Sequence, residues 1–146
     1  MMLKTVYLPN CTKVNNNAFD GCKNLETVYL PNCSYIGKYC FNNCTFSFIS
    51  VSLNALIIDE FAFTDCHHLH FVNLTNCNKI NRYAFRFCSN LESVYINYSS
   101  VTSLGVNAFQ ATNTSFKVYV PSSLVSDYQS AENWSVYSSQ IFPIPE

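Results

Sequence analysis

The chain has 146 residues, a formal net charge of -1 and 12% charged side chains. This is the length of one domain, which can bury a core without metals or cross-links. The eight lysines and arginines are scattered singly, so we expect no nucleic-acid partner, because phosphate binding needs a basic stripe. No apolar run approaches the roughly 20 residues of a membrane span, and we expect none.

The chain repeats itself about every 22 residues. Phenylalanines occur at positions 19, 41, 63, 85 and 109, so the first three spacings are equal and the last is slightly longer. An aliphatic residue lies five positions before each phenylalanine, and a cysteine lies three positions after each of the first four. A repeat at this period indicates a solenoid. We expect five copies in residues 1–115, with approximate bounds 3–24, 25–45, 46–68, 69–90 and 91–115.

Each copy opens with a Leu-x-x-Val-x-Leu pattern, which predicts a short strand. Pro9 and Pro31 should end the first two strands. One copy cannot bury its own apolar face, so copies should stack in parallel and place equivalent residues in four interior ladders. The first two ladders, on the strand, are Val6, Val28, Val72 and Val94, and Leu8, Leu30, Leu74 and Ile96. The other two have one residue in each copy: Val14, Ile36, Ile58, Ile80 and Leu104, and Phe19, Phe41, Phe63, Phe85 and Phe109.

Two copies depart from the pattern. In the third copy, Phe46, Ile49 and Val51 fit only if the strand slips by one residue, which predicts a bulge or an irregular turn. The fifth copy carries two extra residues, which we place in a loop.

The pattern LxxVxLPxCxxIGxxxFxxC resembles the BspA-like leucine-rich repeats, with Ile36-Gly37 and Phe41-Asn42-Asn43-Cys44 as matching residues. The resemblance covers residues 3 to 115. It implies a right-handed leucine-rich-repeat solenoid and a place on surface proteins of host-associated bacteria or protist parasites. It also implies that partners are held on the strand face.

Residues 116–146 break the repeat and predict a C-terminal strand-plus-helix cap. Pro121 should end a last strand, and Ser122 or Ser123 should cap a helix with apolar residues Leu124, Tyr128 and Ala131. A second apolar cluster consists of Trp134, Tyr137, Ile141 and Phe142. No such unit precedes Leu3, so we expect an open first coil, which continues a longer array or pairs with a second copy.

The eight cysteines follow the repeat, which favours buried free thiols that fill equivalent sites. Disulfides between neighbouring coils are a geometrically possible alternative. A metal site is disfavoured because zinc sites usually show two close pairs. Its candidate ligands are Cys40 with Cys44, or Cys66 with His67, His68 and His70. We expect His67 and His68 in a solvent-facing turn. We expect neither a metal nor a cofactor.

The sequence carries no GxSxG, HExxH or phosphate-binding glycine loop. Asp59 and Glu60 are neighbours that point in different directions, so they cannot form a carboxylate dyad alone. We therefore expect that the chain is not an enzyme.

Outward positions of successive strands predict an aromatic stripe on one face of the sheet. The stripe would consist of Tyr7, Tyr29, Phe48, Phe71, Tyr95 and Tyr119. Tyrosine is enriched in binding patches, although aromatic residues also stabilise exposed strands simply by cross-strand packing.

The resemblance implies a cell-surface or secreted recognition and adhesion module that binds a host or extracellular-matrix protein. Met1-Met2-Leu3-Lys4 does not resemble a secretory leader, so an extracellular location would require the chain to be part of a longer protein. The alternatives are a structural or self-associating spacer of a larger surface protein and a carbohydrate-binding accessory domain.

Overall fold

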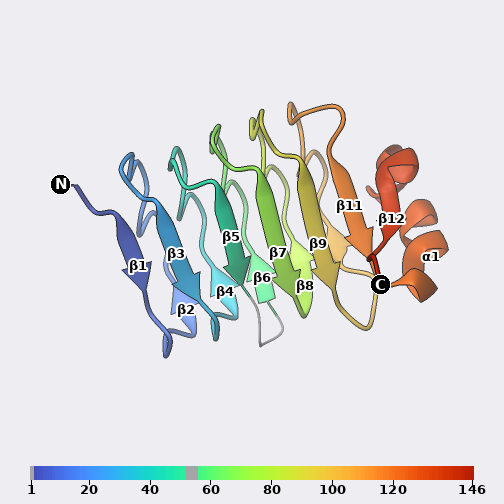
Figure 1. The fold of residues 1–146 in the computed structure, drawn as a ribbon, viewed down its shortest axis with the longest axis horizontal. Coiled ribbons are helices and arrows are strands. Elements are labelled where there is room, and N and C mark those ends of the chain that lie inside the picture. Colours follow the sequence, from blue (N-terminus) through green and yellow to red (C-terminus); the bar gives the residue numbers. More distant parts are fainter. Residues whose placement is uncertain (1, 52–55) are drawn as a thin grey trace.

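The computed structural model describes residues 2–51 and 56–146, except for the side chains of Phe48, Ser50 and Val51. The chain winds into stacked coils, and each of the first five coils contributes one strand to each of two parallel sheets (Figure 1). In the described residues, the first sheet has seven strands, in the order β1 (Thr5–Tyr7), β3 (Thr27–Leu30), β5 (Phe48–Val51), β7 (Phe71–Thr75), β9 (Ser93–Asn97), β11 (Lys117–Val120) and β12 (Ile141–Pro143). The second has five, in the order β10 (Ser103–Leu104), β8 (Cys77–Ile80), β6 (Leu56–Ile58), β4 (Tyr35–Ile36) and β2 (Lys13–Val14). This architecture is the expected repeat solenoid.

The pairing register follows the sequence repeat. Val6 pairs with Val28, and Ile36 pairs with Ile58, each a full repeat further along the chain. The third coil breaks this spacing, because Ser50 lies one position short of a full repeat from its partner Tyr29 and one position more than a full repeat from its partner Asn73. The register also shifts between Leu56 and Ile57 where β6 meets β8. The predicted one-residue slip and the accompanying irregularity are therefore confirmed; residues 52–55 of that turn lie outside the described part.

The core lies between the two sheets and is built from columns of equivalent side chains. Phe41, Phe63, Phe85 and Phe109 are buried, and neighbouring rings of this column are 5.0–5.4 Å apart and nearly parallel. Two residues of the predicted interior ladders are not fully buried: Phe19 is half-buried and Leu8 is exposed. Both lie in the first coil, where no further described coil covers them.

The phenylalanine column sits in a tight turn with two left-handed residues per coil. One lies two positions before the phenylalanine and the other two positions after it, and their φ angles are between 54° and 72°. Asn and Gly tolerate this conformation best, yet several positions carry aromatic residues. The first set is Asn17, Tyr39, Phe61, Tyr83 and Asn107, and the second is Gly21, Asn43, Asp65, Phe87 and Ala111.

A helical cap covers the last coil, at the opposite end from β1 (Figure 1). It consists of the 3₁₀ helix η1 (Ser122–Leu124), helix α1 (Val125–Ser130) and the 3₁₀ helix η2 (Ser135–Gln140). The serine cap predicted for the helix is wrong, because α1 begins after Leu124 without a side-chain cap. The 3₁₀ turn that starts after Pro121 takes up both serines instead.

Hydrogen bonds between Thr102 and two buried aromatic residues attach the cap to the fifth coil. The Trp134 indole N–H donates to the Thr102 carbonyl oxygen at 2.7 Å, and the Thr102 backbone N–H donates to the Tyr128 hydroxyl oxygen at 2.9 Å. The chain then returns to the first sheet as β12, parallel to β11. This strand was not predicted, because Ile141 and Phe142 follow no repeat spacing. Among the described residues, no helix has the length and apolar character of a membrane span.

The phenylalanine column supports a prediction on stability. Phe63 is buried and stacks on Phe41 and Phe85, so Phe63→Ala should lower the free energy of unfolding by about 3–5 kcal/mol. Phe19→Ala is the matched control, because Phe19 is half-buried and stacks on one side only. Urea unfolding followed by circular dichroism measures both variants. Equal losses in the two would contradict a core organised by stacking.

Candidate functional site

The outer face of the first sheet carries the predicted aromatic residues, but in two rows and not in one stripe. Register places Tyr7 beside Tyr29, and Tyr95 beside Tyr119 and Asn73. Ser50 and Asn73 occupy the same row between the two tyrosine pairs. The single stripe predicted from the sequence is thus interrupted in coils three and four.

Phe71 lies in the adjacent row, two residues earlier in its strand. Its register partners are Phe48 in β5 and Ser93 in β9. The backbone of Phe48 belongs to this second row, while its side chain lies outside the described part. The split follows from the residues at these positions, because Phe71 keeps the regular repeat spacing with Ser93 in β9 and therefore lies in the row next to that of Asn73 and Tyr95.

The aromatic side chains of this face are open to solvent. Tyr7 is 65% exposed, Tyr29 45% and Phe71 44%, whereas Tyr95 and Tyr119 are half-buried. Tyr7 stacks on Tyr29 with ring centroids 5.1 Å apart, and Tyr95 stacks on Tyr119 at 4.6 Å. Stacking on a neighbouring ring restricts the rotamers of each tyrosine, which lowers the entropy cost of binding to the pair.

A hollow separates the two parts of the tyrosine row. It has a volume of about 370 Å³ and is lined by Phe71, Val72, Asn73 and Tyr95. Its position follows from the register, because Asn73 stands where a larger aromatic side chain would fill the row. An apolar hollow of this size suits the insertion of an aromatic or aliphatic side chain from a partner.

Phe142 extends the tyrosine row at the cap. Tyr119 pairs with Phe142 of β12, with ring centroids 6.2 Å apart. The Lys117 ammonium lies 5.6 Å from the centre of the Phe142 ring. Sequence analysis missed this position, because only the return of the chain to the sheet brings Phe142 to the row.

A second aromatic ladder lies on the turns and was also missed. Tyr39 and Phe61 stack at 4.9 Å, and Phe61 and Tyr83 at 5.0 Å. The Arg86 guanidinium lies 5.2 Å from the Tyr83 ring centre and 4.4 Å from that of Phe87. This ladder could have been predicted from the sequence, because each of its three residues lies two positions before the repeated phenylalanine of its copy. Stacking offsets the cost of holding aromatic residues in the left-handed conformation.

The neighbouring carboxylates join coils to one another and do not form a reactive pair. The Tyr35 hydroxyl donates to Asp59 at 2.6 Å, and the Asn81 amide donates to it at 3.0 Å. Desolvation raises the pKa of Asp59, but these hydrogen bonds and that of the Glu60 backbone N–H outweigh it and hold the pKa below its usual value. Glu60 forms ion pairs with Arg82 at 3.1 Å and with Lys38 at 3.4 Å.

The cysteines are free thiols, and six of the eight are buried. Three of them bridge coils by hydrogen bonds: the thiols of Cys44, Cys66 and Cys88 each donate at 3.1 Å to the carbonyl oxygen of a phenylalanine in the preceding coil. Desolvation by burial raises the pKa of Cys44 to about 12, and it does the same for Cys77. These thiols are therefore packing groups with little thiolate character.

The described residues contain no group of three or more His, Cys, Asp or Glu side chains placed to hold a metal ion. The candidate ligands are divided between two environments. Cys40, Cys44 and Cys66 are buried, whereas His67 and His68 lie in an exposed turn, as predicted.

Short parallel strands that pair at the period of the sequence repeat, stacked phenylalanines and a terminal cap define a leucine-rich-repeat solenoid. The family described as "BspA type leucine-rich repeat region (6 copies)" matches residues 2–130, and the chain belongs to this family. Leucine-rich-repeat domains commonly mediate protein interactions, and BspA-type members are typically surface-associated. No curated protein gives a significant match to the chain.

The burial of the thiols can be tested by alkylation. Native protein treated with N-ethylmaleimide at pH 8 should react at Cys11 and Cys22, which are the two half-buried cysteines. The other six should be protected, because burial limits the access of the reagent. Intact mass should show all eight adducts after denaturation without reductant. A deficit in the denatured protein would mean that disulfides join the coils.

Proposed function

We propose that this chain is a recognition module of a cell-surface or secreted protein, and that it binds a protein partner through the outer face of the first sheet. The observation that carries the proposal is the row of tyrosine side chains on the outer face of the first sheet, with the exposed Phe71 in the adjacent row. Family membership supports an interaction role in general, and the geometry supports this face in particular.

The physical case rests on area, rigidity and shape. Tyr7 and Tyr29 present large ring surfaces with hydroxyl groups, and tyrosine supplies both apolar contact and hydrogen bonding at low entropy cost. The hollow between Phe71 and Tyr95 offers a place for an anchoring side chain. We propose a host or extracellular-matrix protein as the partner, and a binding role instead of a catalytic one.

The aromatic face can be tested with a double variant. Tyr29→Ser combined with Tyr95→Ser removes one ring from each tyrosine pair and should weaken binding by about tenfold or more. Surface plasmon resonance against purified fibronectin, laminin and collagen measures the effect. Tyr39→Ser is the matched control, because Tyr39 is an exposed tyrosine on the turns, away from this sheet. Equal affinity of the double variant and the native protein would exclude the face.

A second candidate function is self-association through the first coil. Among the described strands, β1 pairs only with β3. Beside it lies an apolar hollow of about 270 Å³, lined by Leu3, Thr5, Val6, Tyr7, Leu8 and Phe19. An unpaired strand edge next to apolar side chains favours pairing with another strand.

Self-association predicts a mass that depends on concentration. Sedimentation of the native chain should show dimers as concentration rises, and Leu8→Lys should remain monomeric because it places a charge at this edge. Val136→Lys is the control, since Val136 is 76% exposed on the cap at the other end of the stack. A monomeric native chain at every concentration would contradict this second function.

A further inference from the structure

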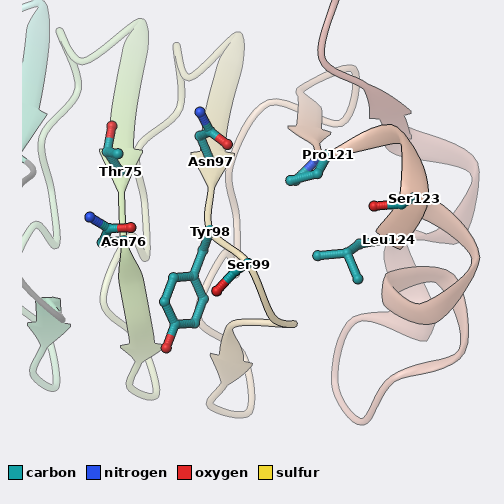
Figure 2. Close-up of a pocket in the computed structure, with 8 residues that line it drawn as sticks. All are labelled: Thr75, Asn76, Asn97, Tyr98, Ser99, Pro121, Ser123 and Leu124. Carbon is teal, nitrogen blue, oxygen red and sulfur yellow. The ribbon is translucent and has the colours of Figure 1, made fainter.

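A polar cleft lies where the strand ends of β7 and β9 face the cap (Figure 2). Its volume is about 510 Å³, which is within the usual range for small-molecule sites. Thr75, Asn97, Tyr98 and Ser99 line it on the side of the coils. Figure 2 shows Ser123 and Leu124 reaching from the cap toward Ser99 and Tyr98.

The cleft originates in the irregularity of the fifth copy. One residue, Asn76, separates β7 from β8, whereas residues 98–102 separate β9 from β10. This longer connection includes the extra length of the fifth copy. Pro121 then ends β11 and turns the chain into η1, so the next layer does not close over the connection. The opening is therefore built into the fold at the junction between repeat and cap.

Four polar side chains of the cleft are available to a ligand, namely those of Thr75, Asn97, Ser99 and Ser123. Within the described residues, the side chains of Thr75, Asn97, Ser99 and Ser123 form no hydrogen bond. Elsewhere in the stack, turn asparagines bridge coils: the Asn90 amide donates to the His67 carbonyl oxygen at 2.6 Å. The amide of Asn97 offers two donors and an acceptor, and each hydroxyl offers one donor and two acceptor lone pairs.

The lining also determines the charge of the ligand. No Asp, Glu, His, Lys or Arg lines the cleft, so a charged ligand would lose hydration without gaining an opposite charge. The half-buried rings of Tyr98 and Pro121 add apolar surface beside the polar groups. Hydroxyl-rich edges combined with apolar ring faces are the chemistry of a sugar.

We propose that this cleft binds a neutral saccharide. Asn97 and Ser123, on opposite walls, hydrogen-bond the sugar hydroxyls, and Tyr98 packs against an apolar face of the ring. The site is separate from the aromatic rows, since its lining contains none of their residues. Binding here is therefore independent of the proposed protein partner.

The test is a titration of the whole chain followed by amide NMR shifts. The probes are maltotetraose, cellotetraose and chitotetraose, each raised to about 10 mM, a range that detects millimolar affinity. At least one should give saturable shifts at residues 97–99 and 123–124. A sulfated heparin hexasaccharide should not bind more tightly than the neutral sugar.

Variants on the two walls separate the cleft from other surfaces. Asn97→Ala and Ser123→Ala alter exposed side chains and should preserve the fold, while each weakens binding by about tenfold. Asn24→Ala is the control, because Asn24 is an exposed asparagine in the first coil. Absence of saturable shifts with all three sugars, or unchanged affinity in both wall variants, would overturn the proposal. Tighter binding of the heparin fragment would do the same.

Discussion

Stacking at a constant register is the interaction on which the rest of this structure depends. A single coil is too thin to bury its own apolar side chains, so each coil is covered by the coils before and after it. The phenylalanine column shows this directly, since Phe41 and Phe85 cover the two faces of the buried Phe63 ring. The buried thiols follow the same register, and the Cys66 thiol reaches the carbonyl oxygen of Phe41 in the preceding coil.

The register that aligns the core also aligns the surface. Tyr7 and Tyr29 stack outside the sheet because Val6 and Val28 stack inside it. Where the repeat is irregular, the surface changes with it. Ser50 in the slipped third strand and Asn73 in the regular fourth strand interrupt the tyrosine row, and the hollow beside Tyr95 lies at that interruption. The longer fifth copy opens the polar cleft against the cap.

Several polar side chains of the stack join neighbouring coils by hydrogen bonds. Asp59 accepts hydrogen bonds from Tyr35 and Asn81, which lie in the coils on either side. The side chains around the cleft differ, because Asn97 and Ser123 are exposed and unbonded within the described residues. The two candidate surfaces therefore present different chemistry: aromatic area for a protein on the sheet, and neutral hydrogen-bonding groups for a saccharide beside the cap.

The sequence by itself determined the repeat, the parallel strands, the slip of the third copy and the columns of Phe and Cys, because each depends on spacing alone. It also placed Tyr7, Tyr29, Phe71, Tyr95 and Tyr119 on the outer face, since side chains alternate along a strand. Only the tertiary structure decided that Phe142 extends the tyrosine row and that Asn97 and Ser123 line the same cleft. The physical reason is that both arrangements depend on how the cap and the longer connection of the fifth coil pack against the regular coils, and the spacing of the repeat does not specify that packing.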